Sequence, residues 1–257
     1  MLNLLNSDLY KLLRRKSFYI CGLIVGALGV IGVLLLNNMI NSDFGIDAQT
    51  LGFNGIQSMS SAMSEITLLI TIFMSIFIPS EFTFGTIKNI ASKGRSRAEI
   101  YLSKLIMGIF VTITYTLFAA IVGFTAGSIM WGTGEFTNEV TLNILRMIGL
   151  FILAEIALQS IYTMVGFLVR HTGGAVAINL GIIIAFPVLT SFIDFALNHW
   201  FKIEFEASKY WVSTYTNSFL NLEIAHDVIN TGIWVSLAYL VISTFIGIIT
   251  FQKRDIK

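Results

Sequence analysis

The residues best placed to do chemistry are a carboxylic acid and a carboxamide inside a long apolar stretch. Glu155 and Gln159 are four positions apart between Ile144 and Val169, so they share one face of a helix. An ionised carboxylate at the centre of a bilayer costs roughly 2.5–3.5 kcal/mol on insertion scales. One interpretation is a polar patch along a substrate or proton route. The other is a structural glutamate that bonds to Gln159 or to hydroxyl groups of neighbouring helices.

A second candidate is the short basic segment of residues 81–104, which connects two apolar runs. Gly85 permits a sharp turn where the chain leaves the first run, and Gly94 divides the segment into a short helix and a turn. A short charged element fixed to two spans could transmit a conformational change from a cytoplasmic partner protein to those spans. The alternative is an ordinary loop whose positive charge only sets the topology.

Several catalytic patterns are absent from the sequence. It contains no G-x-x-x-x-G-K-[ST], G-x-S-x-G or H-E-x-x-H motif. The three histidines are scattered without metal-ligand spacing, and Cys21 is the only cysteine. We therefore expect a chain that is not an enzyme and binds no cofactor or metal, and any ATP hydrolysis that drives it must occur on a separate polypeptide.

The elements that position these residues follow from composition. Of 257 residues, 55% are hydrophobic and 12% are charged, whereas soluble domains carry about 25% charged residues. The mean hydropathy is +0.80. A soluble fold of this size could not bury so much apolar surface, which excludes a soluble enzyme. The net charge of +1 indicates no acidic partner, and no nucleic acid is expected.

The sequence predicts an all-α membrane protein that forms a single domain over residues 1–257. A spanning helix needs about 20 apolar residues, and six runs qualify: Phe18–Leu36, Ala62–Pro79, Leu105–Trp131, Ile144–Val169, Gly174–Ile193 and Ile229–Phe251. Both termini are expected in the cytoplasm of a multi-pass plasma-membrane protein, because 13 of the 16 Lys and Arg residues then lie inside.

Three connections have distinct patterns. Residues 1–16 place leucines on one stripe, which predicts a helix lying in the inner interface (an elbow) before the first span; an unstructured basic tail is the alternative. Only Arg170–Gly173 join spans four and five, so these should form a tight hairpin. The outer region Asp194–Asp227 is rich in aromatic residues, which indicates interfacial or re-entrant helices.

Two pairs of small residues suit close helix packing, and one outer ion pair is conceivable. The spacings Gly22/Gly26 and Gly123/Gly127 are typical of helix contacts, either within the chain or across a dimer. Near the outer ends of their spans, Glu65 and Arg146 are possible partners.

The basic segment also carries a family resemblance. Its pattern comprises Glu81, Gly85-Thr86, Lys88, Ser92-Lys93-Gly94, Ser96-Arg97, Ile100 and Lys104. This pattern resembles the permease subunits of ABC-2 type transporters, whose spans two and three are joined by a coupling helix that docks on the ATPase subunit. The elbow, the six spans and the tail Phe251–Asp255 are similar to the same family. The Ser-Lys-Gly turn resembles the lantibiotic, toxin-peptide and other antimicrobial-peptide exporters and immunity permeases of Gram-positive bacteria.

The resemblance implies a permease of an ATP-driven exporter of amphipathic or antimicrobial peptides, with ATP and Mg on the partner ATPase subunits. It also implies a second permease copy or paralogue. Phe82, Phe84, Ile87 and Ile90 would anchor residues 82–97 on the ATPase, with charge at the rim. The ATPase-coupling residues would be Phe82, Phe84, Gly85, Thr86, Ile87, Lys88, Asn89, Arg95 and Arg97.

Other classes remain open at this point. An ABC-2 permease could carry a drug or a lipid instead of a peptide. An ion-coupled secondary transporter would use Glu155 as its proton site, but it predicts internal repeats, and none is evident between residues 1–130 and 131–257. An intramembrane protease would need paired catalytic residues, which a lone Glu155 does not supply.

Overall fold

The computed structural model describes residues 1–39, 53–200, 202 and 206–253, and these residues contain helices but no strand. The elements in chain order are α1 (Leu2–Arg14), α2 (Lys16–Met39), α3 (Gly55–Ser64), α4 (Ile66–Thr83), α5 (Thr86–Ser92), α6 (Arg97–Trp131), α7 (Asn138–Val169), α8 (Thr172–Trp200), η3 (Ala207–Tyr210), α9 (Val212–Ser218) and α10 (His226–Lys253). Six segments are long and apolar enough to cross a membrane, as predicted. The chain is therefore a multi-pass helical membrane protein.

The second span differs most from its predicted bounds. It covers Gly55–Thr83 and not Ala62–Pro79, and it is divided at Glu65 into α3 and α4. The start of α3 is capped by Asn54, whose side chain accepts a hydrogen bond from the Gln57 amide at 3.0 Å. The sequence prediction missed α3 because its serines make it less apolar than a typical span.

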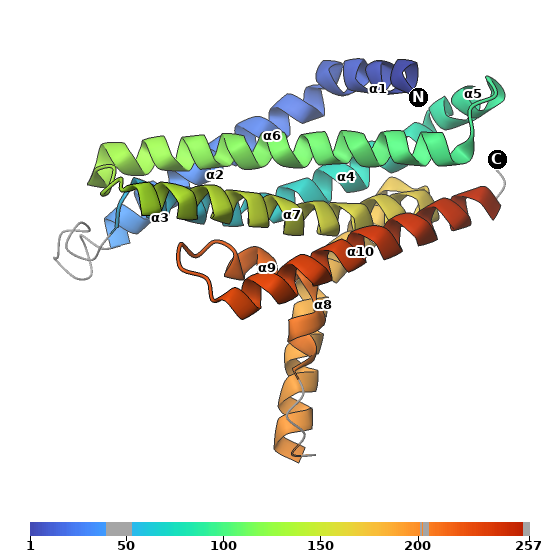
Figure 1. Cartoon of the computed structure of the whole chain (residues 1–257). Coiled ribbons are helices and arrows are strands. Elements are labelled where there is room, and N and C mark those ends of the chain that lie inside the picture. The colour runs from blue at the N-terminus through green and yellow to red at the C-terminus, as the bar shows by residue number, and fades with distance from the viewer. Residues whose placement is uncertain (40–52, 201, 203–205, 254–257) are drawn as a thin grey trace.

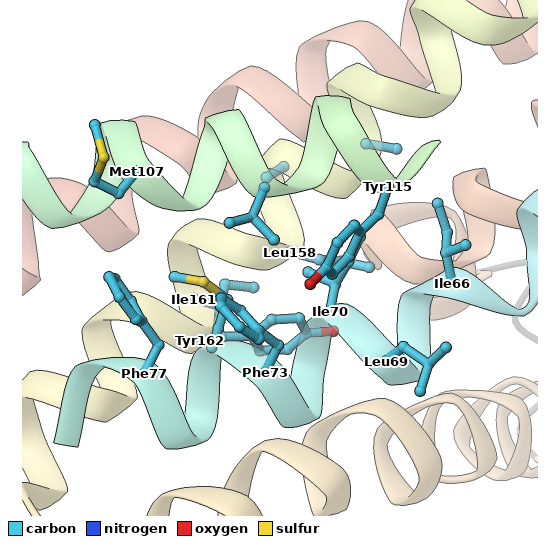
Figure 2. Close-up of a cluster of buried hydrophobic side chains, with 14 of the residues drawn as sticks. Ile66, Leu69, Ile70, Phe73, Phe77, Met107, Tyr115, Leu158, Ile161 and Tyr162 are labelled. Carbon is cyan, nitrogen blue, oxygen red and sulfur yellow. The ribbon is translucent and has the colours of Figure 1, made fainter. Parts of the chain in front are cut away.

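The core lies between α4, α6 and α7, which bury more of their side chains than α2, α8 and α10 do. Figure 2 shows apolar side chains of these three helices meeting, with Phe73 of α4 directed toward Tyr162 of α7. Tyr115 of α6 stacks on Phe18 of α2 with 5.4 Å between ring centroids. The peripheral helices α2, α8 and α10 expose apolar side chains on the outside of the bundle, where lipid would contact them.

Both glycine pairs lie against helices of the same chain. A Cβ at Gly127 would collide with the Ser58 side chain of α3, and one at Gly123 would meet Ala62 at 2.5 Å. Gly22 and Gly26 face aromatic side chains of α6. The pairs therefore permit close packing within the chain.

The region before α10 contains the short helices η3 and α9. Trp211, Tyr215 and Phe219 from this region are buried in the core cluster, whereas Phe201 and Phe205 lie outside the described residues. The link between α7 and α8 is as short as predicted, because α7 ends at Val169 and α8 begins at Thr172. Figure 1 shows the C-terminal part of α8 projecting away from the other helices.

The N-terminus, the end of α10 and α5 lie at the same end of the bundle (Figure 1). α1 is a helix, and the backbone becomes extended at Arg15 before α2 begins. Its buried residues are Leu4, Asp8 and Leu12. Leu5 and Leu9 are half-buried against the core, whereas Leu2 and Leu13 are exposed.

Candidate functional site

The predicted coupling segment is a short helix held between two turns. α4 ends at Thr83, and Gly85 has a φ of 66°, a left-handed conformation that favours glycine. α5 follows, and Gly94, with a φ of 78°, ends the turn after it. α6 then begins with a capping box, in which the Ser96 hydroxyl accepts from the Glu99 amide at 3.2 Å. Local sequence signals thus fix where both spans end.

The apolar side chains of this segment divide between inside and outside. Phe84 is 77% exposed, whereas Ile87 is fully buried. Phe82 packs edge-on against Phe167, with 5.5 Å between ring centroids, and Ile90 is half-buried beside the core. The expectation that all four anchor a partner needs correction. Ile87 and Phe82 belong largely to the chain's own core, so Phe84 is the apolar side chain that projects.

The polar side chains also divide. Lys88, Asn89 and Lys93 are exposed. Arg95 lies 4.0 Å from Glu99 in an ion pair. The Arg97 guanidinium donates to the main-chain carbonyls of Phe251 and Gln252 at 3.2 and 2.7 Å. Arg97 therefore stabilises the C-terminal end of α10, where carbonyl groups have no helical partner.

A buried ion cluster lies where α1, α4 and α6 meet. The Lys104 ammonium of α6 is 2.8 Å from the Asp8 carboxylate of α1 and 2.7 Å from the Glu81 carboxylate of α4. All three side chains are almost completely buried. The Ser103 hydroxyl also donates to Asp8 at 2.6 Å. The cluster thereby joins α1 and both helices that flank the coupling segment.

Further cations surround this cluster. The Lys11 ammonium is 3.7 Å from Asp8. The Arg15 guanidinium donates to the Ser80 hydroxyl at 2.9 Å and lies over the Phe77 ring. Burial lowers the pKa of Arg15 from its usual value, and attraction to Glu81 opposes that effect. Arg15 nevertheless remains charged at neutral pH.

Sequence reasoning identified Glu81 and Lys104 but missed Asp8. One signal could have revealed it. Asp8 lies four residues from both Leu4 and Leu12, on the apolar side of an amphipathic helix. A carboxylate there is rarely buried without a cationic partner.

The intramembrane candidates Glu155 and Gln159 are both fully buried on α7, but neither bonds to the other. Thr67 of α4 donates its hydroxyl hydrogen bond to Glu155 Oε1. Gln159 Nε2 donates instead to Thr163 at 2.8 Å. Glu155 Oε2 and Gln159 Oε1 have no hydrogen-bond partner among the described residues. Of the two structural bonds considered for Glu155, the hydroxyl bond is present and the Gln159 bond is not.

These residues belong to a polar seam between α4, α7 and α8. Thr67, Thr71 and Ser75 follow one face of α4 at intervals of four residues. Asn179 of α8 donates to the Ser75 hydroxyl at 2.7 Å. Asn179 Oδ1 also lacks a hydrogen-bond partner in the described part of the chain. The seam thus offers several unsatisfied polar atoms at membrane depth, where such groups are costly.

A pocket of about 610 Å³ opens beside the Thr67 end of this seam. Thr67, which bonds Glu155 on one side, lines this pocket on the other. Its remaining lining includes Glu65, Pro187 of α8 and Asn217 of α9. No ion pair links Glu65 with Arg146 within residues 1–39, 53–200, 202 and 206–253, so that conceivable contact is not present.

No group of three or more His, Cys, Asp or Glu side chains that could hold a metal ion occurs among the residues that the structure describes. Of the tail Phe251–Asp255, Arg254 and Asp255 lie outside that region.

Comparison with known proteins identifies a family. A family model described as "Protein of unknown function (DUF2705)" matches residues 23–257. No curated protein matches the chain.

Proposed function

We propose that this chain, which belongs to the DUF2705 family, is the transmembrane permease subunit of an ATP-driven exporter of the ABC-2 type. The family description assigns no activity, so the proposal is argued from the residues of the chain itself. The chain itself would be non-catalytic. ATP and Mg would bind to separate ATPase subunits, which would pair with two permeases, either two copies of this chain or a copy and a paralogue.

The observation that carries the proposal is the position of α5. This helix connects α4 with α6, and both of these belong to the buried centre of the bundle. The fully buried Ile87 fixes α5 to the core, while Phe84 and Lys88 face outward. A force applied to this surface would therefore reach two central helices without first deforming a flexible loop.

The ion cluster supports the same function. Asp8, Glu81 and Lys104 connect α1 rigidly with the ends of α4 and α6. α1 would lie in the inner interface as an elbow helix, because its polar face carries Lys11 and Arg14. Both termini would be cytoplasmic in the cell membrane, at the same end as α5.

The proposed cargo is an amphipathic or antimicrobial peptide, such as a toxin peptide, removed from the membrane or the cell. The polar seam at Glu155 and Gln159 and the pocket beside Thr67 would form part of its route. The pocket has an apolar wall from α8 and a polar wall from α9, which suits an amphipathic molecule. A drug or a lipid would fit the same description.

The test uses Phe84→Ala in a tagged chain purified from its native host. We expect ATPase co-purification and cargo-stimulated ATP hydrolysis to fall, because loss of an exposed anchor costs about 2 kcal/mol or more, roughly 30-fold in affinity. Phe136→Ala is the matched control, since Phe136 is also exposed but lies between α6 and α7, away from α5. An ATPase that remains bound and stimulated at wild-type level would remove the main support for the proposal.

A second candidate is an ion-coupled secondary transporter. The buried Glu155 carboxylate, with one oxygen lacking a hydrogen-bond partner among the described residues, favours it. Transport that stops when a proton gradient is collapsed, but continues when ATP is depleted, would select this candidate.

A further inference from the structure

A pocket of about 310 Å³ lies between α1 and the start of α5. Its lining consists of Tyr10, Lys11, Arg14, Arg15, Glu81 and Thr86. The Arg14 guanidinium lies over the Tyr10 ring at 4.7 Å from its centroid, which holds it at the edge of the pocket. Three cationic side chains therefore converge on one cavity: Lys11 and Arg14 from the last turn of α1, and Arg15 from the extended residue that follows it.

The charges around this pocket do not balance. Among the described residues, Glu81 is the only acidic one in the lining, and its carboxylate is 2.7 Å from Lys104. Asp8, the next carboxylate, is 2.8 Å from Lys104 and 3.7 Å from Lys11. Within the part of the chain that the structure describes, four cations thus face two anions, which leaves an excess of two positive charges.

The remaining lining groups suit an anion as well. The Tyr10 and Thr86 hydroxyl groups can donate hydrogen bonds, as can the two guanidinium groups. Guanidinium groups bind phosphate through paired donors, and ammonium groups bind it as point charges. The volume lies at the lower end of the range for small-molecule sites.

We propose that this pocket binds the phosphate group of an anionic phospholipid. Arg14 and Arg15 stand immediately before α2, the first spanning helix, so the pocket opens at the depth where lipid phosphates lie. The headgroup would contact α1 through its cations and α5 through Thr86. The site is defined by the chain alone and does not rest on the proposed export function.

The location gives the bound lipid a role. Thr86 is the first residue of α5, and Glu81 belongs to the ion cluster. A phosphate held there would neutralise the excess positive charge beside the cluster and tie α1 to α5. Anionic lipid would then stabilise the arrangement of the segment that is proposed to meet the ATPase.

The experiment measures binding of short-chain phosphatidylglycerol to the purified chain in a non-ionic detergent, with short-chain phosphatidylcholine and inorganic phosphate as separate arms. The test variant is Lys11→Gln with Arg14→Gln. The matched control is Lys88→Gln with Arg95→Gln, which removes the same charge from the neighbouring segment outside the pocket. We expect phosphatidylglycerol to bind the wild type and the control at least tenfold more tightly than the test variant.

Inorganic phosphate should compete only weakly, and phosphatidylcholine should bind much less tightly than phosphatidylglycerol. Equal binding of the two lipids would overturn the proposal. It would also be overturned by an unchanged affinity in the test variant, or by an equal loss in the control, which would indicate non-specific charge attraction. If inorganic phosphate binds as tightly as phosphatidylglycerol, the lipid proposal is overturned and the pocket is a site for a soluble anion. The lipid-binding experiment uses no ATPase, so its failure would leave the exporter proposal intact, and failure of the exporter proposal would leave the lipid site intact.

Discussion

Lys104 is the residue that holds together the end of the bundle where the N-terminus and α5 lie. It lies between two buried carboxylates, at 2.8 Å from Asp8 and 2.7 Å from Glu81. Removing one partner from a buried ion cluster costs more than the cluster contributes as a whole, because an unpaired charge is left in a low-dielectric site.

We therefore predict that Lys104→Met lowers the free energy of unfolding by about 3–5 kcal/mol. Adding Asp8→Asn and Glu81→Gln to the same chain should restore much of that loss, because no buried charge then remains. Thermal unfolding in detergent measures both variants. Lys88→Met is the matched control, since Lys88 is exposed, and we expect it to change little. An equally destabilised triple variant would show that packing, and not charge, governs this site.

Glu155 is expected to tolerate neutralisation. Glu155→Gln keeps an oxygen that can accept from Thr67 and removes the cost of an ionised carboxylate at membrane depth. We predict normal membrane insertion and thermal stability, with reduced transport if the polar seam is the cargo route. Transport is measured in membrane vesicles that contain the variant, and a wild-type rate would assign Glu155 a structural role.

At this scale the sequence was informative about residue types and less so about pairs. Glu155 and Gln159 could be predicted to share a helix face, since spacing alone determines this. Their partners could not, because Thr67 and Thr163 are reached through tertiary packing and local rotamers. Asp8 and Lys104 meet only once α1 lies against α6, and no local pattern specifies that contact.

Among the elements, α5 owes its place to one buried side chain. Ile87→Ala should lower the free energy of unfolding by about 2–5 kcal/mol, because it empties a fully buried site. The neighbouring Phe84→Ala should leave that free energy nearly unchanged, since Phe84 is mostly exposed. Unfolding curves of the two variants provide the comparison, and similar losses in both would contradict the division between inside and outside.

The turn before α5 depends on backbone conformation alone. No atom lies within 4 Å of a Cβ built at Gly85, but its φ of 66° is costly for other residues. Gly85→Ala should therefore cost about 1–2 kcal/mol. Gly149→Ala serves as the control, because no atom lies within 4 Å of a Cβ built there but, unlike Gly85, this residue has helical backbone geometry inside α7. Its free energy of unfolding is expected to rise by roughly 0.5–1 kcal/mol. A neutral Gly85→Ala variant would mean that the turn can adopt another conformation.

The elements themselves were largely predictable. Six apolar runs identified the six spans, because run length is a direct consequence of bilayer thickness. The division of the second span at Glu65 was not predictable, since α3 contains four serines whose hydroxyl groups bond to the helix backbone. α5 was expected between its two glycines, but the burial of Ile87 depends on the packing of α5 against α4 and α6, which no local pattern specifies.

For the whole molecule, the positions of the charges predict one orientation. In a chain with Cys21→Ala, Lys93→Cys should be inaccessible to an impermeant thiol reagent in intact cells, whereas Glu206→Cys should react. Both side chains are exposed on the protein, so burial would not mask the result. Labelling of Lys93→Cys from outside, with protection of Glu206→Cys, would reverse the topology and remove α5 from the cytoplasm.

The ion cluster has a consequence for biosynthesis. Asp8 leaves the ribosome before its partner Lys104, which follows roughly 100 residues later, or about 5–20 s at typical elongation rates. During that interval the carboxylate lacks its main counter-charge and cannot enter the hydrocarbon region cheaply. α1 should therefore wait at the aqueous surface while α2 and α4 insert, and it would dock only when α6 arrives. Ribosome-stalled chains that end before Lys104 should expose α1 to protease, and longer chains should protect it.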